Sequence, residues 1–298
     1  MRWVRVLGVA IASLVVLLAI AAGLIFAISE FQIGRKYDVQ VATLEVRTDA
    51  TALAQGQHVA TIRGCRDCHK PDLAGAILVE DPFVGRVGAP NLTPGRSTPL
   101  TDEDFVRAVR HGLRRDGTSL LIMPSHEYWH LSDSDLSALL AYVRSVPAVE
   151  RETPPRRIAL PIRAIFLFSG DEVALLPAAL IDHDAPRPES PREGDVQALG
   201  KYLAVTCTGC HGKGLGGGVI PGVGPNWPAA SNLTPAGNLV RWTHEQFVTA
   251  LRSGRTPEGR QLDPRYMPWP QLGTMTDAEM SALWDYLRAV PARETGTR

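Results

Sequence analysis

The chain contains two short stretches in which two cysteines and a histidine stand at a fixed spacing. Cysteine occurs only four times in 298 residues, as two Cys-x-x-Cys pairs that are each followed directly by a histidine. Side chains at positions i, i+3 and i+4 of a helix lie on one face, so two thiols and an imidazole could act together. The residues are Cys65, Cys68 and His69 in the first stretch, and Cys207, Cys210 and His211 in the second.

Two neighbouring thiols beside an imidazole suit the covalent attachment of a porphyrin. The thiols can bond two vinyl groups, and the histidine then binds the iron, which is c-type haem attachment. We therefore expect two covalently bound haem c groups. A disulfide redox pair is one alternative, but it normally lies in a βαβ context that this sequence lacks. A four-cysteine zinc site normally separates its pairs by about 15–20 residues, whereas the second pair here follows the first by 142 residues.

The second axial ligand of each iron is predicted to be a methionine. Met123 and Met267 each precede a proline, 54 and 56 residues after the histidine of their own stretch. A thioether is a soft, neutral ligand that together with histidine raises the reduction potential. The alternative is that these methionines only pack in the core. The rival ligands, which have no counterpart in the other half of the chain, are His111, His126, His130 and Met275.

Two arginines occupy equivalent positions, each just before a glycine that should end a helix. A guanidinium fork binds carboxylates well, so Arg110 and Arg252 could bind the haem propionates. An arginine on a solvated helix face is an equally good alternative. Asn91 and Asn232 could also bond propionates, but we expect them rather to shape the turns in which they lie.

The two cysteine stretches head similar blocks of sequence, which indicates an internal repeat. "PNLTP" at 90–94 matches "SNLTP" at 231–235, and "LSALLAYVRSVP" at 136–147 matches "MSALWDYLRAVP" at 280–291. The offset between matching residues stays between 141 and 144. We therefore expect two copies of one domain with small changes in loop length.

Each copy is predicted to be mostly helical, with long loops rich in glycine and proline. Capping signals place helices at 50–63, at 101–112 and from 132 to before Pro147, with copies at 243–254 and 276–291. Large apolar residues are few, so the core should be thin and the porphyrin should help to fill it. The apolar faces of the last helix in the two copies are Leu136, Leu139, Leu140 and Val143, and Met280, Leu283, Trp284 and Leu287.

The N-terminal segment is predicted to cross a membrane. The 23 residues from Val6 to Ile28 carry no charge, and a membrane-spanning helix needs about 20. Arg2 and Arg5 should keep the N-terminus in the cytoplasm. A secretory signal has a shorter apolar core of about 7–15 residues. A cleaved signal remains the alternative to a retained anchor, because Ala-Ile-Ala at 19–21 resembles a cleavage site.

A second apolar segment, at 158–181, is not expected to span. It contains Pro161, Arg163, Asp171 and Glu172, so we expect a linker that packs on a domain surface or on a partner. Lys plus Arg and Asp plus Glu both number 31. A formal net charge of zero argues against a nucleic-acid partner, which would require a basic surface.

The repeated Cys-x-x-Cys-His, the later Met-Pro and the closing helix resemble class I cytochrome c domains. The stretches "APNLTP", "TDEDFVRAVRHG" and "MPSHEYWHLSDSDL" are more specific, and are similar to the cytochrome c subunits of membrane-bound bacterial dehydrogenases for alcohols, aldehydes and gluconate. The resemblance covers about residues 36–293. It implies an electron-transfer subunit that takes electrons from a dehydrogenase or from the quinone pool. Those subunits commonly carry three such motifs, whereas this chain has two.

The expected fold class is all-α, with one N-terminal transmembrane helix followed by two tandem class I cytochrome c domains. We expect an electron-transfer protein rather than an enzyme, held in the inner membrane by a single pass with its haem domains in the periplasm. The redox partner would be a dehydrogenase, a quinol-oxidising complex, a soluble cytochrome or a terminal oxidase. The alternative is a two-haem peroxidase-like oxidoreductase, which would need one open iron site. The expected divisions are an anchor at 1–30, a linker at 31–49, a domain at 50–150, a linker at 151–192 and a domain at 193–293.

Overall fold

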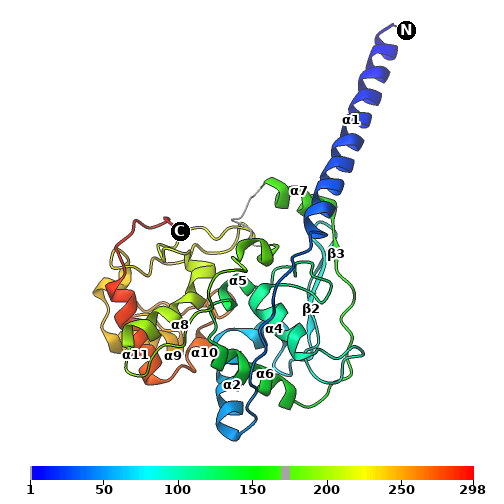
Figure 1. The fold of residues 1–298 in the computed structure, drawn as a ribbon. Helices are drawn as coiled ribbons and strands as arrows, with labels where there is room; N and C mark the ends of the chain where they lie inside the picture. The colour runs from blue at the N-terminus through cyan, green and yellow to red at the C-terminus, as the bar shows by residue number, and fades with distance from the viewer. Residues whose placement is uncertain (1, 169–174) are drawn as a thin grey trace.

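The computed structural model describes residues 2–168 and 175–298. The helix α1 (Arg2–Ile33) projects away from the body formed by the rest of the chain (Figure 1). Among the described residues it is the one helix long and apolar enough to cross a membrane. Its side chains are exposed except near its C-terminal end, where Ser29 and Ile33 are buried.

Residues 50–145 form a first, mostly helical unit. The three predicted helices are confirmed because the predicted caps form. Thr101 makes a capping box with Asp104, and Gly112 ends that helix with a left-handed φ of 64°. The unit contains α2 (Ala50–Ile62), α3 (Cys65–His69), α4 (Asp102–His111), α5 (Ser125–Tyr128) and α6 (Asp133–Ser145).

A second unit repeats this arrangement between residues 196 and 289. Capping boxes again start its last two long helices, at Thr243 and Thr276. Here one continuous helix carries the Cys-x-x-Cys-His motif, whereas in the first unit the chain breaks into α2 and α3 at Arg63 and Gly64. The elements are α8 (Val196–His211), η3 (Asn238–Arg241), α9 (His244–Ser253), α10 (Trp269–Leu272) and α11 (Asp277–Ala289).

A small antiparallel sheet is the departure from the all-α expectation. It comprises β1 (Ala76–Asp81), β2 (Gly85–Ala89) and β3 (Arg157–Ile158) in the order β1-β2-β3. The register shifts between Ile77 and Val79, so the strand does not show a regular alternation in the sequence. In the second copy only an isolated bridge between Gly218 and Ala230 stands at the equivalent place, so the repeat did not indicate a hairpin.

The linker between the units packs as predicted on other parts of the protein. The helix α7 (Leu160–Phe168) lies against the end of α1 (Figure 1). The short η2 (Pro177–Leu180) lies on the first unit, where the Ala178 N–H donates to the Ser119 hydroxyl at 3.3 Å. Asp171 and Glu172, which were expected to prevent a second span, lie outside the described residues.

The first and last helices of each unit cross where one of them carries a glycine. α2 meets α6 at Gly56, and α8 meets α11 at Gly200. Both glycines face backbone carbonyl groups so closely that no side chain fits between the helices. The predicted apolar faces of α6 and α11 are buried at these crossings, except that Trp284 is half-buried.

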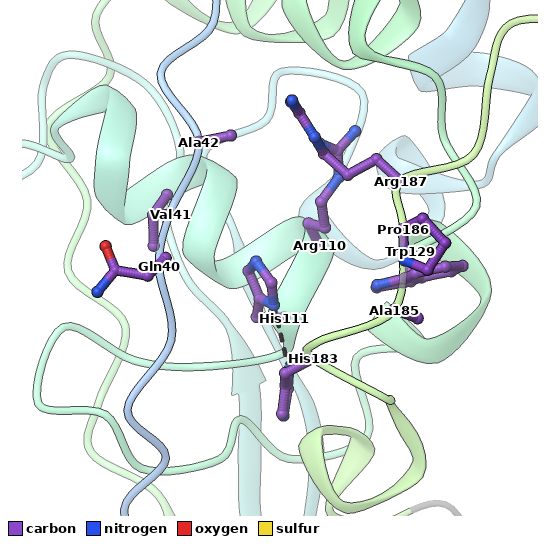
Figure 2. A pocket seen from close by; sticks show the side chains of 10 residues that line it. All are labelled: Gln40, Val41, Ala42, Arg110, His111, Trp129, His183, Ala185, Pro186 and Arg187. Atoms are coloured by element: carbon purple, nitrogen blue, oxygen red, sulfur yellow. Dashed lines mark hydrogen bonds between the residues drawn. The ribbon is translucent and has the colours of Figure 1, made fainter.

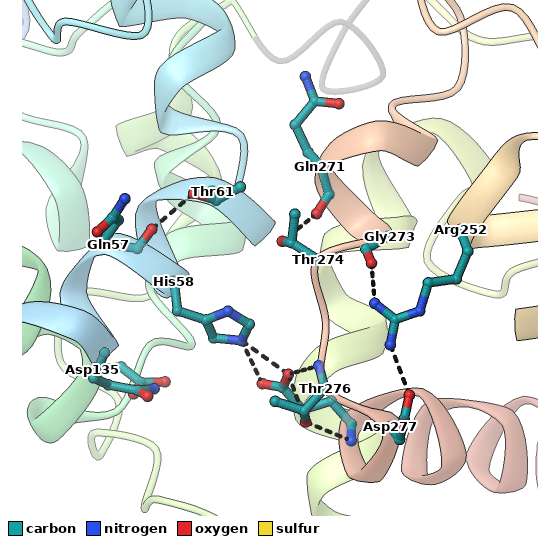
Figure 3. A network of polar contacts seen from close by, with 12 residues as sticks. Gln57, His58, Thr61, Asp135, Arg252, Gln271, Gly273, Thr274, Thr276 and Asp277 are labelled. Atoms are coloured by element: carbon teal, nitrogen blue, oxygen red, sulfur yellow. Dashed lines mark hydrogen bonds and ion pairs between the residues drawn. The ribbon is translucent and has the colours of Figure 1, made fainter. Parts of the chain in front are cut away.

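The two units dock through contacts that the internal repeat relates to one another. On one side His58 of α2 hydrogen-bonds the Glu279 carboxylate at the start of α11 at 2.9 Å (Figure 3). On the other side Tyr202 of α8 donates its hydroxyl to Asp135 at the start of α6. Ile62 of the first unit is part of the apolar core of the second. The interface is therefore roughly two-fold, with each first helix contacting the last helix of the other unit.

Alanine at either crossing glycine should destabilise the protein. A Cβ at Gly56 would lie 2.0 Å from the Ala138 carbonyl oxygen, and one at Gly200 would lie 2.1 Å from that of Ala282. Overpacking of this kind costs about 1–3 kcal/mol. Denaturant unfolding of the haem-loaded protein would measure the loss. Gly224→Ala is the control, since its Cβ would meet nothing nearer than 3.9 Å; equal stabilities for all three variants would contradict the close crossing.

The His58–Glu279 contact should make the docked structure sensitive to pH. The hydrogen bond that His58 donates to the Glu279 carboxylate raises the pKa of His58 above its usual value of 6.5, although burial opposes this shift. Stability from a raised pKa is complete below the unfolded value and is lost as pH rises through the folded value. Thermal unfolding midpoints should therefore separate wild type from His58→Gln at pH 6 and converge by pH 9. A difference that stays constant with pH would show that the charged pair contributes nothing.

Candidate haem sites

Both motif histidines are held in the tautomer that an iron ligand requires. The Nδ1 atom of His69 lies 2.8 Å from the Pro90 carbonyl oxygen, and that of His211 lies 2.7 Å from the Ser231 carbonyl oxygen. A carbonyl oxygen only accepts hydrogen bonds, so Nδ1 must carry the hydrogen in each ring. Nε2 is then left with its lone pair, as metal-binding histidines with a backbone partner have it. Burial also lowers the pKa of both rings, which favours their neutral form.

A strained turn after each motif holds the segment whose carbonyl oxygen accepts this hydrogen bond. Leu73 and Leu215 occupy equivalent positions and have φ values of 56° and 59°, a conformation that is uncommon for leucine. Their carbonyl oxygens accept the N–H groups of Leu92 and Leu233 at 2.9 and 2.8 Å. These bonds fix the segment that carries each acceptor carbonyl, at a point two residues after that carbonyl. The repeated "NLTP" sequence thus helps to hold the carbonyl group that accepts the imidazole hydrogen bond.

The asparagines of the same sequence shape the turn, as expected. The Asn91 side-chain amide donates to the Val149 carbonyl at 2.7 Å, and that of Asn232 donates to the Arg293 carbonyl at 2.8 Å. Each asparagine also accepts the N–H two residues later at 2.8 Å. Both amides therefore connect the segment that accepts the histidine hydrogen bond to the chain that follows the last helix of the unit.

The cysteines fit thioether attachment better than either alternative. No disulfide joins any of the four cysteines, and burial raises the pKa of Cys65 and Cys207 to about 12. A redox-active pair needs a thiol with a lowered pKa, so the disulfide alternative is not supported. Within residues 2–168 and 175–298 no cluster of three or more His, Cys, Asp or Glu side chains could hold a metal ion. The structure therefore does not bring the four cysteines together as a zinc site.

The predicted methionines pack on the apolar core of their own unit. Met123 and Cys65 pack on the same apolar core, and Met267 and Cys207 pack on the other. Both methionines are half-buried. The rival Met275 is only 1% exposed inside the second core. Ligation by Met123 and Met267 stays a prediction. Met275 packs on the same core as Cys207, so this packing favours Met123 in the first unit but does not distinguish Met267 from Met275 in the second.

The rival histidines of the first unit have other surroundings. His111 Nδ1 lies 3.1 Å from His183 Nδ1, at a pocket of about 360 Å³ that the motif cysteines and histidines do not line (Figure 2). Burial, with a smaller effect of His183, lowers the pKa of His111 to about 4. His130 is exposed and packs edge-on against Trp129. His126 lies half-buried in α5, three residues after Met123.

Both candidate propionate-binding arginines hold the start of the last helix in their unit. Arg110 is buried and donates to the Asp133 carboxylate at 2.7 Å. Arg252 donates to the Asp277 carboxylate at 2.7 Å (Figure 3). Each guanidinium also bonds a backbone carbonyl just before that helix. Propionate binding by these arginines stays a prediction, and the bonds that they make in the structure give them a structural role.

The structure also brings the two motifs close to each other's methionine loops, which sequence reasoning missed. Gln271 donates to Asp67, inside the first motif, at 2.6 Å. The Glu127 carboxylate lies against Gly209, inside the second motif, where a Cβ would come within 2.4 Å of it. Gln271 and Glu127 each follow their methionine by four residues, and Asp67 and Gly209 each follow a first cysteine by two. Only the repeat offset could have indicated this pairing.

A buried cation lies between the motifs. Arg63, two residues before Cys65, is 6% exposed. Its guanidinium donates to the hydroxyl of Thr206, one residue before Cys207, and lies 4.8 Å from the centre of the Tyr202 ring. Its carbonyl oxygen accepts the Tyr128 hydroxyl at 2.9 Å. The two haem-attachment segments are thus joined through one side chain.

Comparisons with known proteins agree with this geometry. Residues 197–291 match the family model described as cytochrome c. Residues 51–143 match the model described as cytochrome c oxidase, cbb3-type, subunit III. The two matches fall on the two structural units, and each includes one of the motifs. Cytochrome c domains of this kind imply covalently bound haem c.

Several curated proteins are similar over most of the chain. The fructose dehydrogenase cytochrome subunit of Gluconobacter japonicus is 27% identical, over 81% of this chain and 53% of that protein. The gluconate 2-dehydrogenase cytochrome c subunit of Pantoea cypripedii is 28% identical, over 80% of this chain and 60% of that protein. A diheme cytochrome c-type protein of Cereibacter sphaeroides is 26% identical, over 81% and 86%. The chain spans about half the length of the first two relatives. It therefore contains two cytochrome c domains and is similar over most of its length to the cytochrome c subunits of bacterial dehydrogenases.

Proposed function

We propose that this chain is a membrane-anchored electron-transfer protein with two haem c groups, one in each domain at 50–150 and 193–293. The observation that carries the proposal is the pair of motif histidines whose Nδ1 atoms are both bonded to backbone carbonyl oxygens. A histidine that only packed in a core would not need the same orienting partner in both copies.

Haem c supplies an iron centre that alternates between the ferrous and ferric states. The thioethers of each motif would fix the group to its helix, and the proximal ligands would be His69 and His211. The carbonyl partner prevents each imidazole from rotating, and the strained turn prevents the carbonyl from moving. Met123 and Met267 would be the second ligands of the two irons, so neither redox state would require a new bond. The residues thus keep the surroundings of the iron constant during transfer.

The docking of the units supports electron transfer from one domain to the other. The segments that attach the two groups face each other through Arg63 and Thr206, and α5 and α10 each contact the motif-bearing side of the opposite unit. Docking of this kind would hold the two sites at a fixed separation. Transfer between them would then need no rearrangement of the domains.

The partner that we propose is a dehydrogenase or another respiratory complex in the same membrane. The support is the similarity to cytochrome c subunits of dehydrogenases for fructose, alcohol and gluconate. We propose that α1 is retained as a single-pass inner-membrane anchor, with both domains in the periplasm. An anchor would raise the concentration of the domains near such partners.

Intact-mass analysis and a redox titration of protein matured in its native host would test the proposed function. We expect a mass increase for two covalently attached tetrapyrroles, an uncleaved N-terminus, and two waves in the titration. Free thiols with no added mass would refute the proposal. Loss of the first segment would instead refute only the retained anchor.

Replacing either ligand methionine should lower the potential of one haem and spare the other. Leucine keeps the volume of methionine but cannot bind iron, and His/Met ligation is what raises the potential. Met123→Leu and Met267→Leu should each shift one wave of the titration, with a matching change in the visible and magnetic spectra. Met275→Leu is the control and should shift neither wave. Native potentials in both test variants would show that other groups are the ligands.

Replacing the cation between the motifs should lower both potentials. A buried positive charge disfavours the ferric state, and burial weakens the screening by solvent and salt. Arg63→Gln should therefore move both waves downward, while Arg63→Lys should keep them closer to wild type. Arg241→Gln, which removes an exposed charge from the second unit, should leave them unchanged. If Arg63→Gln and Arg241→Gln behave alike, the buried charge does not act on either site.

A further inference from the structure

A short apolar helix beside the end of α1 buries its charged residue and exposes apolar side chains, which is the reverse of a helix on a soluble surface. The sequence of α7 is LPIRAIFLF, with one charged residue among nine. That residue, Arg163, is 7% exposed, whereas Leu160 is 40% and Phe168 is 83% exposed. A helix on a water-covered surface turns its charged residues outward and its apolar residues inward. The exposed face of α7 therefore suits an apolar surrounding.

The buried arginine fixes α7 to the end of α1. Its guanidinium lies 2.6 Å from the Glu30 carboxylate and 2.8 Å from the Ser29 hydroxyl. It also bonds the Ile158 carbonyl at 3.0 Å and lies 4.6 Å from the centre of the Phe26 ring. These contacts come from both sides of the helix crossing, so the position of α7 relative to α1 is set by one charged side chain.

The crossing lies at the level where α1 would leave a bilayer. The uncharged run from Val6 to Ile28 would extend about 34 Å at about 1.5 Å per residue, against a hydrocarbon thickness of about 30 Å. Ser29 and Glu30 follow this run directly, so the Arg163–Glu30 pair would lie at the boundary with the headgroups. In Figure 1 α7 lies across α1 on the side of the body from which α1 projects.

The exposed phenylalanines of the chain gather around this crossing. Three of the seven phenylalanines are buried or half-buried, and the other four are between 51% and 83% exposed. The β1–β2 turn adjoins α7, because the Ala159 N–H donates to the Val84 carbonyl at 3.1 Å. Large apolar rings favour the boundary between headgroups and acyl chains. The four exposed residues are Phe26 and Phe31 in α1, Phe83 in the β1–β2 turn and Phe168 in α7.

Positive charges surround the same region. Arg35 and Lys36 follow α1, and Arg157 precedes α7; all three are exposed. Basic residues beside a membrane-embedded element are attracted to anionic lipid headgroups. Of the nearby carboxylates, Glu30 is paired with Arg163 and Glu80 is paired with Arg86. Asp81 accepts the Phe83 and Val84 N–H groups within the β1–β2 turn.

We infer that α7 and the β1–β2 turn rest in the interfacial layer of the bilayer that α1 crosses, as a second membrane contact that orients the haem domains. The inference rests on the retained anchor of the proposed function. The occupant of the apolar face is lipid rather than protein because the face continues from α1, lies at the headgroup level and is bordered by cations. A bilayer contact at two places prevents the body from swinging about the single helix.

Site-directed spin labelling of the full chain would test this contact. Single cysteines at Phe168, Phe83, Leu17 and Thr51 would be labelled with a nitroxide after haem attachment, and the visible spectrum would confirm folding. Each protein would be placed in vesicles of phosphatidylethanolamine and phosphatidylglycerol. Collision of the label with oxygen, which enters lipid, would be compared with collision with a water-soluble nickel complex. Leu17 lies in the middle of α1, and Thr51 lies in α2, away from α1 in Figure 1.

We expect the oxygen-to-nickel ratio at Phe168→Cys and Phe83→Cys to exceed that at Thr51→Cys several-fold, and Leu17→Cys to give the highest value. Labels at 168 and 83 that match Thr51→Cys, with Leu17→Cys still in lipid, would overturn the second contact and leave the anchor standing. Labels that neither reagent reaches would show a covering protein and would also overturn it. A water-exposed label at Leu17→Cys would remove the anchor itself, and the inference would fall with it.

Discussion

The hydrogen bond from each motif histidine to a backbone carbonyl is the constraint on which both sites depend. It fixes the orientation of the ring and leaves one nitrogen available to bind iron. Its acceptor needs support in turn, which comes from a strained leucine turn and from an asparagine tied to the chain after the last helix. The repeated sequences around the motif are therefore best understood as successive supports for one imidazole, and they account for loops that are long and yet well defined.

Docking of the two units brings each of the two equivalent sites into contact with the opposite unit. The contacts between the units follow the repeat, so that each motif meets the loop beyond the other unit's methionine. Arg63 breaks this symmetry because the chain before the first motif is interrupted where α8 is continuous. A single buried cation then belongs to both sites. The two copies of the domain thus have different surroundings although their predicted ligands are the same.

Local features of this protein could be predicted from its sequence, whereas contacts between distant segments could not. Thr101 and Gly112 predict the two ends of α4 because capping involves residues only a few positions apart in the sequence. The short α5 and α10 were missed since four residues show no period, and the bulged β1 was missed because its alternation is broken. Arg110 was considered for a propionate, but the residue that it binds, Asp133, approaches it only after the chain has folded. The haem motifs were recognised because the covalent chemistry requires their residues to be neighbours.

The first unit supports the rest of the molecule. The N-terminal segment pairs with it between Lys36 and Thr118, the sheet connects it to α7, and the second unit docks on its α2. The second unit has no comparable tie to α1 among the described residues. Its position relative to α1 therefore depends on the docking interface and on the linker that joins the units. His58 and Arg63 both lie in this interface, so the interface governs the separation of the two sites as well as the position of the second site relative to α1.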